Sequence, residues 1–196
     1  MKNAERASAT RARLIAVARQ MFGAQGYAGT ATEAVLQEAG VARGALYHHF
    51  ADKAALFEAV CLAVCEDIVP AVDEAAAARR EPLDALVHGS IRWIEKTSEP
   101  EARRILMIDA PTVLGWERWQ ALDDRLSQAS LAAGMQAAIA AGALRFDCRL
   151  ELAVAMMNGA LNALALRVNA PEAPVPPREW RRAVRTLWAA HAVERE

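Results

Sequence analysis

A single glycine near the N-terminus, Gly40, separates two short helical patterns, and this arrangement constrains the fold more than any other feature of the chain. The first pattern carries its apolar residues on one face, and the second runs from about Ala42 to His49. Because glycine adopts positive φ at low cost, Gly40 permits a sharp reversal between the two helices. The spacing therefore predicts a helix-turn-helix within the segment from about Thr30 to Lys53.

Signals for helix ends flank this motif. Apolar residues at helical spacing predict a first helix from about Ser8 to Gln25 that stops at Gly26. The run Thr30-Ala31-Thr32-Glu33 has the pattern of a capping box, in which the Thr30 hydroxyl and the Glu33 carboxylate cap the second helix. Asp52 is placed to cap a fourth helix.

The rest of the chain also favours helices. Alanine and leucine are abundant, alternating strand patterns are absent from the sequence, and Pro and Gly fall where helices end. We therefore expect an all-α fold with further helices at about 83–96, 101–108, 113–141, 150–168 and 178–193.

The net charge of −1 hides an uneven distribution along the chain. Up to Leu56, seven Lys and Arg residues face four Asp and Glu residues, which gives +3, whereas the remainder carries −4. Lys and Arg neutralise phosphates when a protein binds nucleic acid. The basic excess therefore favours DNA as the partner of the N-terminal module.

Residues suited to DNA contact gather around the second helix of the motif. Arg43 lies in its first turn, where a guanidinium can present two parallel donors to the O6 and N7 acceptors of guanine. Gly44 removes a side chain at the point of closest approach, and Lys53 adds its charge at the start of the next helix. We expect Arg43 to read a base and the rest of the set to position the module on the DNA backbone: Thr30, Thr32, Ala42, Gly44, Tyr47, His48, His49 and Lys53. The alternatives are an exposed arginine without a ligand and, for Tyr47, a ring that covers the core.

Within residues 10–57 one run is highly specific: Ala39-Gly40-Val41-Ala42-Arg43-Gly44-Ala45-Leu46-Tyr47-His48-His49-Phe50. Together with Thr10-Arg11, Phe22, Gly26-Tyr27, Thr30 and Lys53, this run resembles the TetR family of bacterial repressors. Ala31 and Ala42 depart from that resemblance, because the family often has Ser or Thr at both positions. The missing hydroxyls could have contacted phosphate or capped a helix, so backbone amides must make the contacts there.

The resemblance implies an all-α homodimer with an N-terminal DNA-binding module and a C-terminal effector-binding body, whose last two helices form a four-helix dimer interface. We expect a repressor that a small apolar or amphipathic ligand releases from a pseudo-palindromic operator, with reading heads ~34–36 Å apart. The functional boundary is expected inside the fourth helix. Residues 1–56 are then the DNA-binding domain, and residues 57–196 the effector-binding and dimerisation domain.

An aromatic and sulfur-rich set indicates where an effector could bind, because Trp supplies apolar area and Met adapts its shape. The expected pocket residues are Trp93, Met107, Trp116, Trp119, Met156 and Asn158, with ordinary core packing as the alternative for each. Asn158 and Asn162 are one helical turn apart in an apolar helix, so they need polar partners if buried. A ligand or the dimer interface could supply these partners, and the sequence slightly favours the interface.

The last two helices carry matching apolar surfaces. The segment 150–168 is rich in small and apolar residues, and the final helix has an apolar stripe of Trp180, Val184, Leu187 and Trp188. Two such helices per subunit would bury a large isologous surface.

Three other functions compete with a DNA-binding regulator. The first is an enzyme, but the sequence has no glycine-rich phosphate loop, nucleophile elbow or metal-ligand cluster, and His88 and His191 have no evident partners. The second is a redox switch through Cys61 and Cys65, which lie one helical turn apart. The third is a purely structural helical dimer, which leaves the DNA-contact set unexplained.

We expect no cofactor and no metal, because His48 and His49 would point about 100° apart on a helix and lack a nearby third ligand. The N-terminal residues lack the apolar stretch of a signal peptide, and no apolar run reaches membrane-spanning length without a charge. Three cysteines, an odd number, suit a reducing compartment. The sequence therefore predicts a cytoplasmic protein without a membrane partner.

Overall fold

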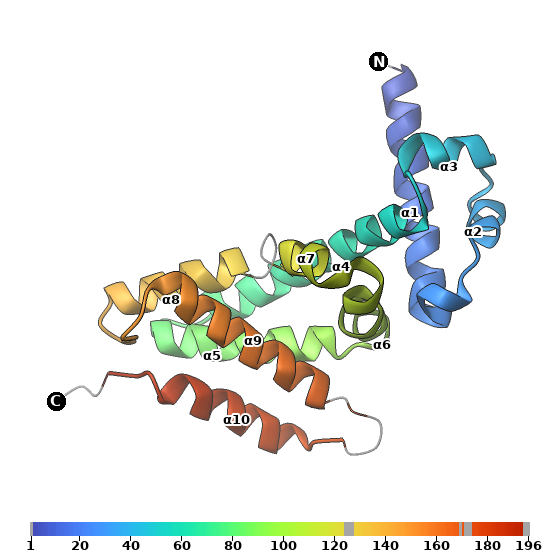
Figure 1. Cartoon of the computed structure of the whole chain (residues 1–196). Helices are drawn as coiled ribbons and strands as arrows, with labels where there is room; N and C mark the ends of the chain where they lie inside the picture. Colours follow the sequence, from blue (N-terminus) through green and yellow to red (C-terminus); the bar gives the residue numbers. More distant parts are fainter. Residues whose placement is uncertain (1, 124–127, 169, 171–173, 194–196) are drawn as a thin grey trace. The chain divides into compact units, whose positions relative to one another are not determined.

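Two compact helical units make up the computed structural model, which describes residues 2–123, 128–168, 170 and 174–193 (Figure 1). The first, here the N-terminal unit, comprises Met1–Val64 and Glu99–Gln120. The second, the C-terminal unit, comprises Cys65–Ser98 and Ala121–Glu196. The all-α expectation is confirmed.

The N-terminal unit contains the predicted motif and a later segment of the chain. Its elements are α1 (Lys2–Gly29), α2 (Thr32–Ala39), α3 (Arg43–His49), the first part of α4 (Lys53–Ala77), α6 (Pro100–Ala102), the π-helical turn η1 (Arg103–Asp109) and most of α7 (Ala110–Asp123). Phe22, Tyr27 and Phe57 form an aromatic cluster with ring centroids 5.1–5.7 Å apart. This cluster joins α1 to α4 and so fixes the base on which α2 and α3 rest.

The helix-turn-helix forms as the sequence predicts. Gly40 has φ 62°, and its N–H donates to the carbonyls of Leu36 and Gln37, which ends α2. Asp52 caps α4, because its Oδ1 accepts the Ala55 N–H at 2.7 Å. Helix α3 follows α2 after only three residues, as the motif requires.

Two local expectations for the ends of α1 and α2 are wrong. Helix α1 begins at Lys2 rather than Ser8, whereas the expected stop at Gly26 is present as a break with φ 75°, after which a short helical segment continues to Gly29. No capping box forms, because Ala31 occupies the N-cap of α2 and supplies no side-chain cap. The Thr30 side chain is fully buried, and its hydroxyl donates to the Gly26 carbonyl at 2.9 Å instead. The break at Gly26 exposes that carbonyl to the hydroxyl, which explains the difference.

The C-terminal unit is a set of packed helices around an apolar core. It contains the end of α4 together with α5 (Pro82–Thr97), α8 (Ala129–Ala140), α9 (Leu150–Val168) and α10 (Pro177–Ala189). Helices α9 and α10 run side by side in Figure 1. Ile94, Met135, Met157, Val184 and Trp188 are at most 1% exposed and form its centre.

The expected single helix over 113–141 is also wrong. Gly115 interrupts α7 with φ 73°, and α8 begins only at Ala129. Residues 124–127, which the expected helix included, lie outside the described residues. Glycine has no side chain that opposes a positive φ, so the helix can break at Gly115. The apolar periodicity of the sequence continues through this position and does not reveal the break.

The apolar stripe of α10 packs within its own chain. Trp180, Val184 and Trp188 are buried, and the Trp188 Nε1–H donates to Ser90 Oγ on α5 at 2.9 Å. The expectation that this stripe faces a second subunit is therefore wrong for these three residues, which pack within their own chain, whereas Leu187 is half-buried. In the part of the chain that the structure describes, no helix is long and apolar enough to cross a membrane.

Candidate DNA-contacting surface and candidate ligand cavity

One face of α3 is turned to solvent, and Leu46 sets its orientation. Leu46 is fully buried and Phe50 is 4% exposed, so the opposite face of α3 points outward. Arg43 is exposed in the first turn, and its Cζ lies 5.7 Å from the centroid of the Tyr47 ring. A Cβ added at Gly44 would meet no atom within 4 Å, so the surface beside Arg43 is open. This face can approach the floor of a groove closely.

The remaining predicted contact residues differ in their exposure. Tyr47 is 47% exposed, His48 is exposed, and His49 is half-buried with its ring 5.2 Å from that of His48. Ala42 is exposed at the N-cap of α3, and Thr32 is half-buried in the first turn of α2. Thr30 does not belong to this surface, because its buried hydroxyl is bonded to the chain itself.

The two alanines that depart from the family pattern both lie at helix N-caps. Ala31 precedes α2 and Ala42 precedes α3, each in an extended conformation, and neither helix has a side-chain cap. Ser, Thr, Asp or Asn at such a position would bond an amide of the first turn. Helices α2 and α3 therefore both begin without the side-chain cap that a Ser or Thr hydroxyl would supply.

Lys53 is held against the end of α1. Its ammonium donates to the Tyr27 carbonyl at 2.5 Å and lies 4.1 Å from the centroid of the Tyr27 ring. Burial lowers the pKa of Lys53, whereas burial and then the Asp52 carboxylate raise the pKa of Tyr27. The ammonium has three donors, so this contact leaves capacity for a phosphate. Sequence reasoning missed the Tyr27 contact, because 26 residues separate the pair.

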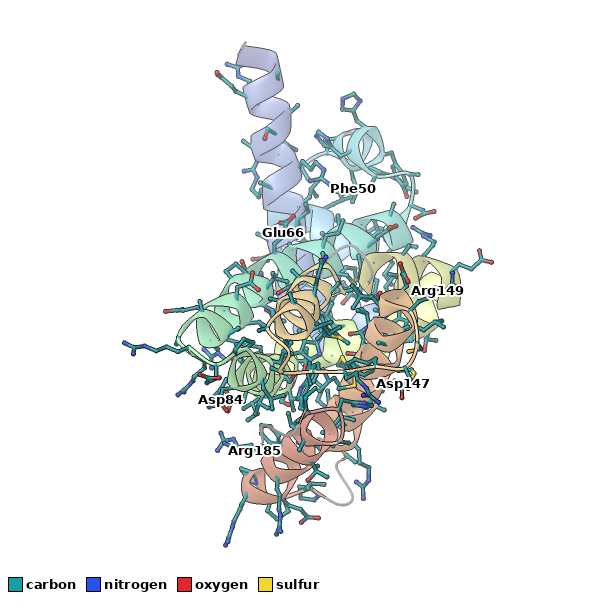
Figure 2. All side chains as sticks on the ribbon, turned by 90° about the vertical axis from the view of Figure 1, so that its left-hand side faces the viewer. Phe50, Glu66, Asp84, Asp147, Arg149 and Arg185 are labelled. Carbon is teal, nitrogen blue, oxygen red and sulfur yellow. The ribbon has the colours of Figure 1, made fainter. Side chains whose placement is uncertain are left out.

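Arg11 of α1 adds a positive charge near the end of α3. Its Cζ lies 5.3 Å from the centroid of the Phe50 ring, and Figure 2 shows Phe50 where α3 ends, close to α1. A guanidinium over an aromatic face is weakly attracted to it, which orients the side chain.

A later segment of the chain is fastened to α1 by polar contacts that sequence reasoning missed. The Arg19 Nε–H donates to Glu101 Oε1 at 2.7 Å, and the Tyr27 N–H donates to Asp109 Oδ2 at 2.7 Å. Arg104 lies 3.7 Å from the same Asp109 oxygen. In the two hydrogen bonds to α1, the donor and acceptor residues are 82 positions apart, and no local pattern in the sequence links residues at that separation.

The C-terminal unit contains a mainly apolar cavity of about 370 Å³. Its walls come from the end of α4, the turn before α5, and helices α5, α8 and α9. Trp93 and Asn158, two of the six predicted pocket residues, line it and are buried. The volume lies within the range of small-molecule sites, about 300–1,000 Å³.

Three predicted pocket residues do not line this cavity. Met107 is buried in η1 and Trp119 is half-buried in α7, both in the N-terminal unit, and Met156 is 59% exposed on α9. The Trp116 side chain lies outside those that the structure describes. Helical periodicity marks a residue as apolar or inward-facing, but it does not assign the residue to one unit rather than the other.

The two amides of α9 face the interior of their own chain. Asn158 and Asn162 are each 7% exposed, and Asn162 Oδ1 accepts the Trp93 Nε1–H at 3.1 Å. The preference for placing them at a dimer interface is therefore wrong for Asn162, which has its partner on α5.

The cysteines and histidines do not assemble into a metal-binding cluster among the described residues. Cys61 and Cys65 are buried on α4, and Cys148 is exposed. A buried thiol is poorly accessible to oxidants, so this placement does not favour the redox alternative.

Family models match most of the chain in two pieces. Residues 14–60 match the model of bacterial regulatory proteins of the TetR family, and residues 83–190 match the tetracyclin repressor-like C-terminal domain. The second match alone covers more than half of the chain.

Curated relatives and solved structures point the same way. The HTH-type transcriptional regulator AcrR of Shigella flexneri is 33% identical over 108 residues, which are 54% of this chain and 50% of AcrR. UidR of Escherichia coli K12 is 31% identical over 80 residues, 41% of this chain and 37% of UidR. The chain thus spans half or less of the length of these relatives.

Among solved structures, a TetR-family transcriptional regulator of Pectobacterium atrosepticum is 25% identical with a TM-score of 0.82, over 98% of both chains. The complex of RolR with resorcinol is 18% identical with a TM-score of 0.76, over 94% of this chain and 89% of RolR, which supports the fold alone.

Proposed function

Because the chain belongs to the TetR family of bacterial regulatory proteins, we propose that it is a sequence-specific DNA-binding repressor, released from its operator by a small apolar or amphipathic ligand. The observation that carries this proposal is the open face of α3, where exposed Arg43 stands beside an unobstructed Gly44. A guanidinium so placed can bond the O6 and N7 atoms of guanine in the major groove.

Backbone contacts position this reading head in the proposal. The proposal assigns contacts with phosphates or sugars to the side chains of Thr32, Tyr47, His48 and His49 and to the backbone at Ala42 and Gly44. Lys53 adds a charge while it holds the end of α1. Thr30 leaves the contact set that the sequence suggested and acts in packing.

A second copy of the chain supplies the second head. Helix α9 exposes Leu152 (51%), Met156 (59%) and Leu166 (46%). With Gly159 and Ala163, which are also exposed, these residues follow alternating spacings of four and three, the pattern of a helix–helix seam. We assign this seam to the dimer interface. We place α10 at the edge of the interface, because the exposed face of α10 carries charged side chains such as Arg185 (Figure 2).

Ligand binding in the C-terminal unit would disfavour the DNA-binding arrangement. The ligand acts only if it binds the non-DNA arrangement more tightly. Resorcinol bound to RolR, a protein of the same fold, supports a small-molecule occupant here. In the proposal, α4 transmits the effect of the ligand from residues 57–196, the effector-binding and dimerisation domain, to residues 1–56, the DNA-binding domain. Such a regulator meets its DNA in the cytoplasm and needs no catalytic activity.

Operator binding by an Arg43→Ala variant tests the proposal. The operator is first located by footprinting the DNA that flanks the gene, and each of its base pairs is then varied. Arg43→Ala should lose about 1–3 kcal/mol and should lose discrimination at one base position. Arg145→Ala, which removes an exposed arginine of the C-terminal unit, is the matched control and should bind as the wild type does. Full affinity and specificity in Arg43→Ala would overturn the assignment of the reading residue.

A further inference from the structure

The cavity of the C-terminal unit has a buried end and an exposed end. Trp93, Ser90 and Leu86 are buried at one side, whereas Arg79 and Arg80 line the cavity and are exposed. Ala77 and Ala137 also line the cavity and are exposed, so the two arginines, in the turn between α4 and α5, belong to its solvent-facing side.

The buried polar groups of α5 are already paired within the protein. Ser90 Oγ donates to the Leu86 carbonyl at 2.7 Å and accepts the Trp188 Nε1–H at 2.9 Å. The Trp93 indole N–H donates to Asn162. The Ser90 hydroxyl and the Trp93 indole have no donor left for a ligand, so an anionic or carbonyl group placed against them would have to break one of these bonds, and this wall favours an apolar part of a ligand.

The two arginines are the charged residues that line the cavity, and the described lining includes no carboxylate. Glu81 and Asp84 follow them in sequence, but both are exposed and do not line the cavity. Asp73 accepts a hydrogen bond from Ser130, a residue of the wall, and does not itself line the cavity. Among the described residues, Arg79 and Arg80 form no ion pair. Two adjacent guanidiniums that form no ion pair with the described residues offer planar donors that match an anionic headgroup.

We propose that this cavity binds an amphipathic anion, with an apolar chain against Trp93 and Leu86 and a carboxylate or phosphate headgroup at Arg79 and Arg80. The binding preference is a property of the cavity, and only its regulatory consequence rests on the proposed function. Among amphipathic molecules, the arrangement selects anions over neutral and cationic analogues of the same chain length.

Calorimetric titration of the full-length protein with matched ten-carbon probes tests the preference. The probes are decanoate, decyl phosphate, 1-decanol and decylamine, each below the concentration at which it forms micelles. Decanoate or decyl phosphate should bind about tenfold or more tightly than decanol, and decylamine should bind most weakly. The comparison of the two anions distinguishes a carboxylate from a phosphate headgroup. Equal affinity for decanoate, decyl phosphate and decanol, or tighter binding of decylamine, would overturn the proposal.

Substitution of the rim tests the role of the two arginines. The double variant R79Q/R80Q should lose the preference for anions and keep the wild-type affinity for decanol. R182Q, which neutralises an exposed arginine of α10, is the control and should keep the preference. A preference unchanged in R79Q/R80Q would assign the anion to another site and overturn the proposal.

A filled cavity tests whether the chain binds inside the unit. A Cβ at Gly89 would lie 3.5 Å from the Ala76 Cβ and 3.6 Å from Val72 Cγ1, so a side chain there points into the walls of the cavity. Gly89→Leu should abolish binding of all four probes. Ala76→Leu, on the facing helix, serves in its place if the first variant does not fold, as judged by circular dichroism. Unchanged decanoate binding in the folded variant would show that the anion binds elsewhere.

Operator release is measured separately, so that the two proposals can fail independently. If decanoate binds with the expected preference and leaves the operator complex intact, the cavity assignment stands and the ligand-release part of the proposed function fails. If another compound releases the operator and the probes show no preference for anions, the repressor function stands and the anion assignment fails.

Discussion

At Lys53, one charge serves the packing of the N-terminal unit and is also available to DNA. The ammonium donates to the Tyr27 carbonyl, which also accepts the Thr30 N–H at 3.4 Å near the end of α1. A motif assigns Lys53 to DNA because of its place in the sequence, but the contact with Tyr27 appears only when α1 and α4 are packed together. We therefore expect loss of this side chain to lower both the stability of the N-terminal unit and the proposed affinity for DNA.

The raised pKa of Tyr27 predicts a specific loss of stability at alkaline pH. Burial is the larger cause, and the Asp52 carboxylate adds to it, so the folded protein holds the phenol proton more tightly than the unfolded chain does. For a raised pKa, the stabilisation is fully present below the unfolded value of 10.0 and is lost as the pH rises through the folded value. The free energy of unfolding of the wild type should therefore fall relative to that of Tyr27→Phe above pH 10.0.

Urea denaturation of both proteins at pH 7, 9 and 11 measures this difference. The two proteins should differ by the same amount at pH 7 and pH 9, and the wild type should lose its relative advantage at pH 11. A difference that stays constant through pH 11 would show that Tyr27 has the same pKa in both states.

Thr30 shows where a residue pattern misleads. Thr30-Ala31-Thr32-Glu33 satisfies the capping-box rule in letters, yet α2 starts one residue later and Thr30 turns inward to Gly26. The rule assumes that the chain before the helix is extended and exposed, and the break at Gly26 places Thr30 against α1 instead. No single-sequence pattern reports the direction of the preceding helix.

At the scale of elements, the starts of α2 and α3 can each be improved by one hydroxyl. Ala42 has the extended N-cap conformation and is exposed, so a serine there can bond an amide of the first turn of α3 without repacking. Ala42→Ser should raise the free energy of unfolding by about 1 kcal/mol. Thermal and urea denaturation measure the gain.

A serine in a helix interior controls for the change of side chain itself. Ala24 is exposed within α1, where a hydroxyl has no cap to form, so Ala24→Ser should be neutral or slightly destabilising. If both variants changed the stability equally, the N-cap of α3 would not be the site of the gain.

The breaks at Gly26 and Gly115 form a matched pair. Gly26 has φ 75° and ψ 170°, and Gly115 has φ 73° and ψ 167°, a region that is almost restricted to glycine. A Cβ at Gly115 would meet nothing within 4 Å, whereas one at Gly26 would lie 2.6 Å from a guanidinium nitrogen of Arg104. Gly115→Ala should lose about 1–3 kcal/mol of stability from backbone strain alone.

Gly26→Ala should lose more, because Arg104 must also move from its position near Asp109. Urea denaturation of the two variants and of Gly26→Ala in an Arg104→Ala background separates the two causes. This explanation is contradicted if, in the Arg104→Ala background, Gly26→Ala still lowers the free energy of unfolding much more than Gly115→Ala does.

The helices themselves were largely predictable, and their partners were not. The range 150–168 matches α9, and the turn at Gly40 and the cap at Asp52 are as expected, because propensity, caps and glycine act within a few residues. The cavity and the fastening of Glu101 and Asp109 to α1 depend on contacts across some 80 residues, and periodicity carries no information about them. For that reason, of the predicted pocket residues whose side chains the structure describes, only Trp93 and Asn158 line the cavity.

At the scale of the whole molecule, dimerisation should set the affinity for DNA. Each N-terminal module carries an excess of only +3 up to Leu56, so one head neutralises few phosphates. In the proposed dimer, two DNA-binding modules joined through α9 would bind one operator together, and the second contact would then benefit from a high effective concentration. Operator affinity is therefore expected to depend on the seam of α9, although that seam touches no DNA.

Met156→Glu tests this dependence. Met156 is 59% exposed in the single chain, so the carboxylate should leave the fold of the chain intact. In the dimer the same carboxylate would be buried without a partner, which costs several kcal/mol. Sedimentation at micromolar concentration should shift from dimer to monomer, and the slope of log affinity against log salt for the operator should fall to about half. Gln136→Glu, which adds the same charge at an exposed position of α8, should remain dimeric and bind as the wild type does. A Met156→Glu protein that stays dimeric would place the interface on another face, and a monomer that keeps full operator affinity would refute the need for two heads.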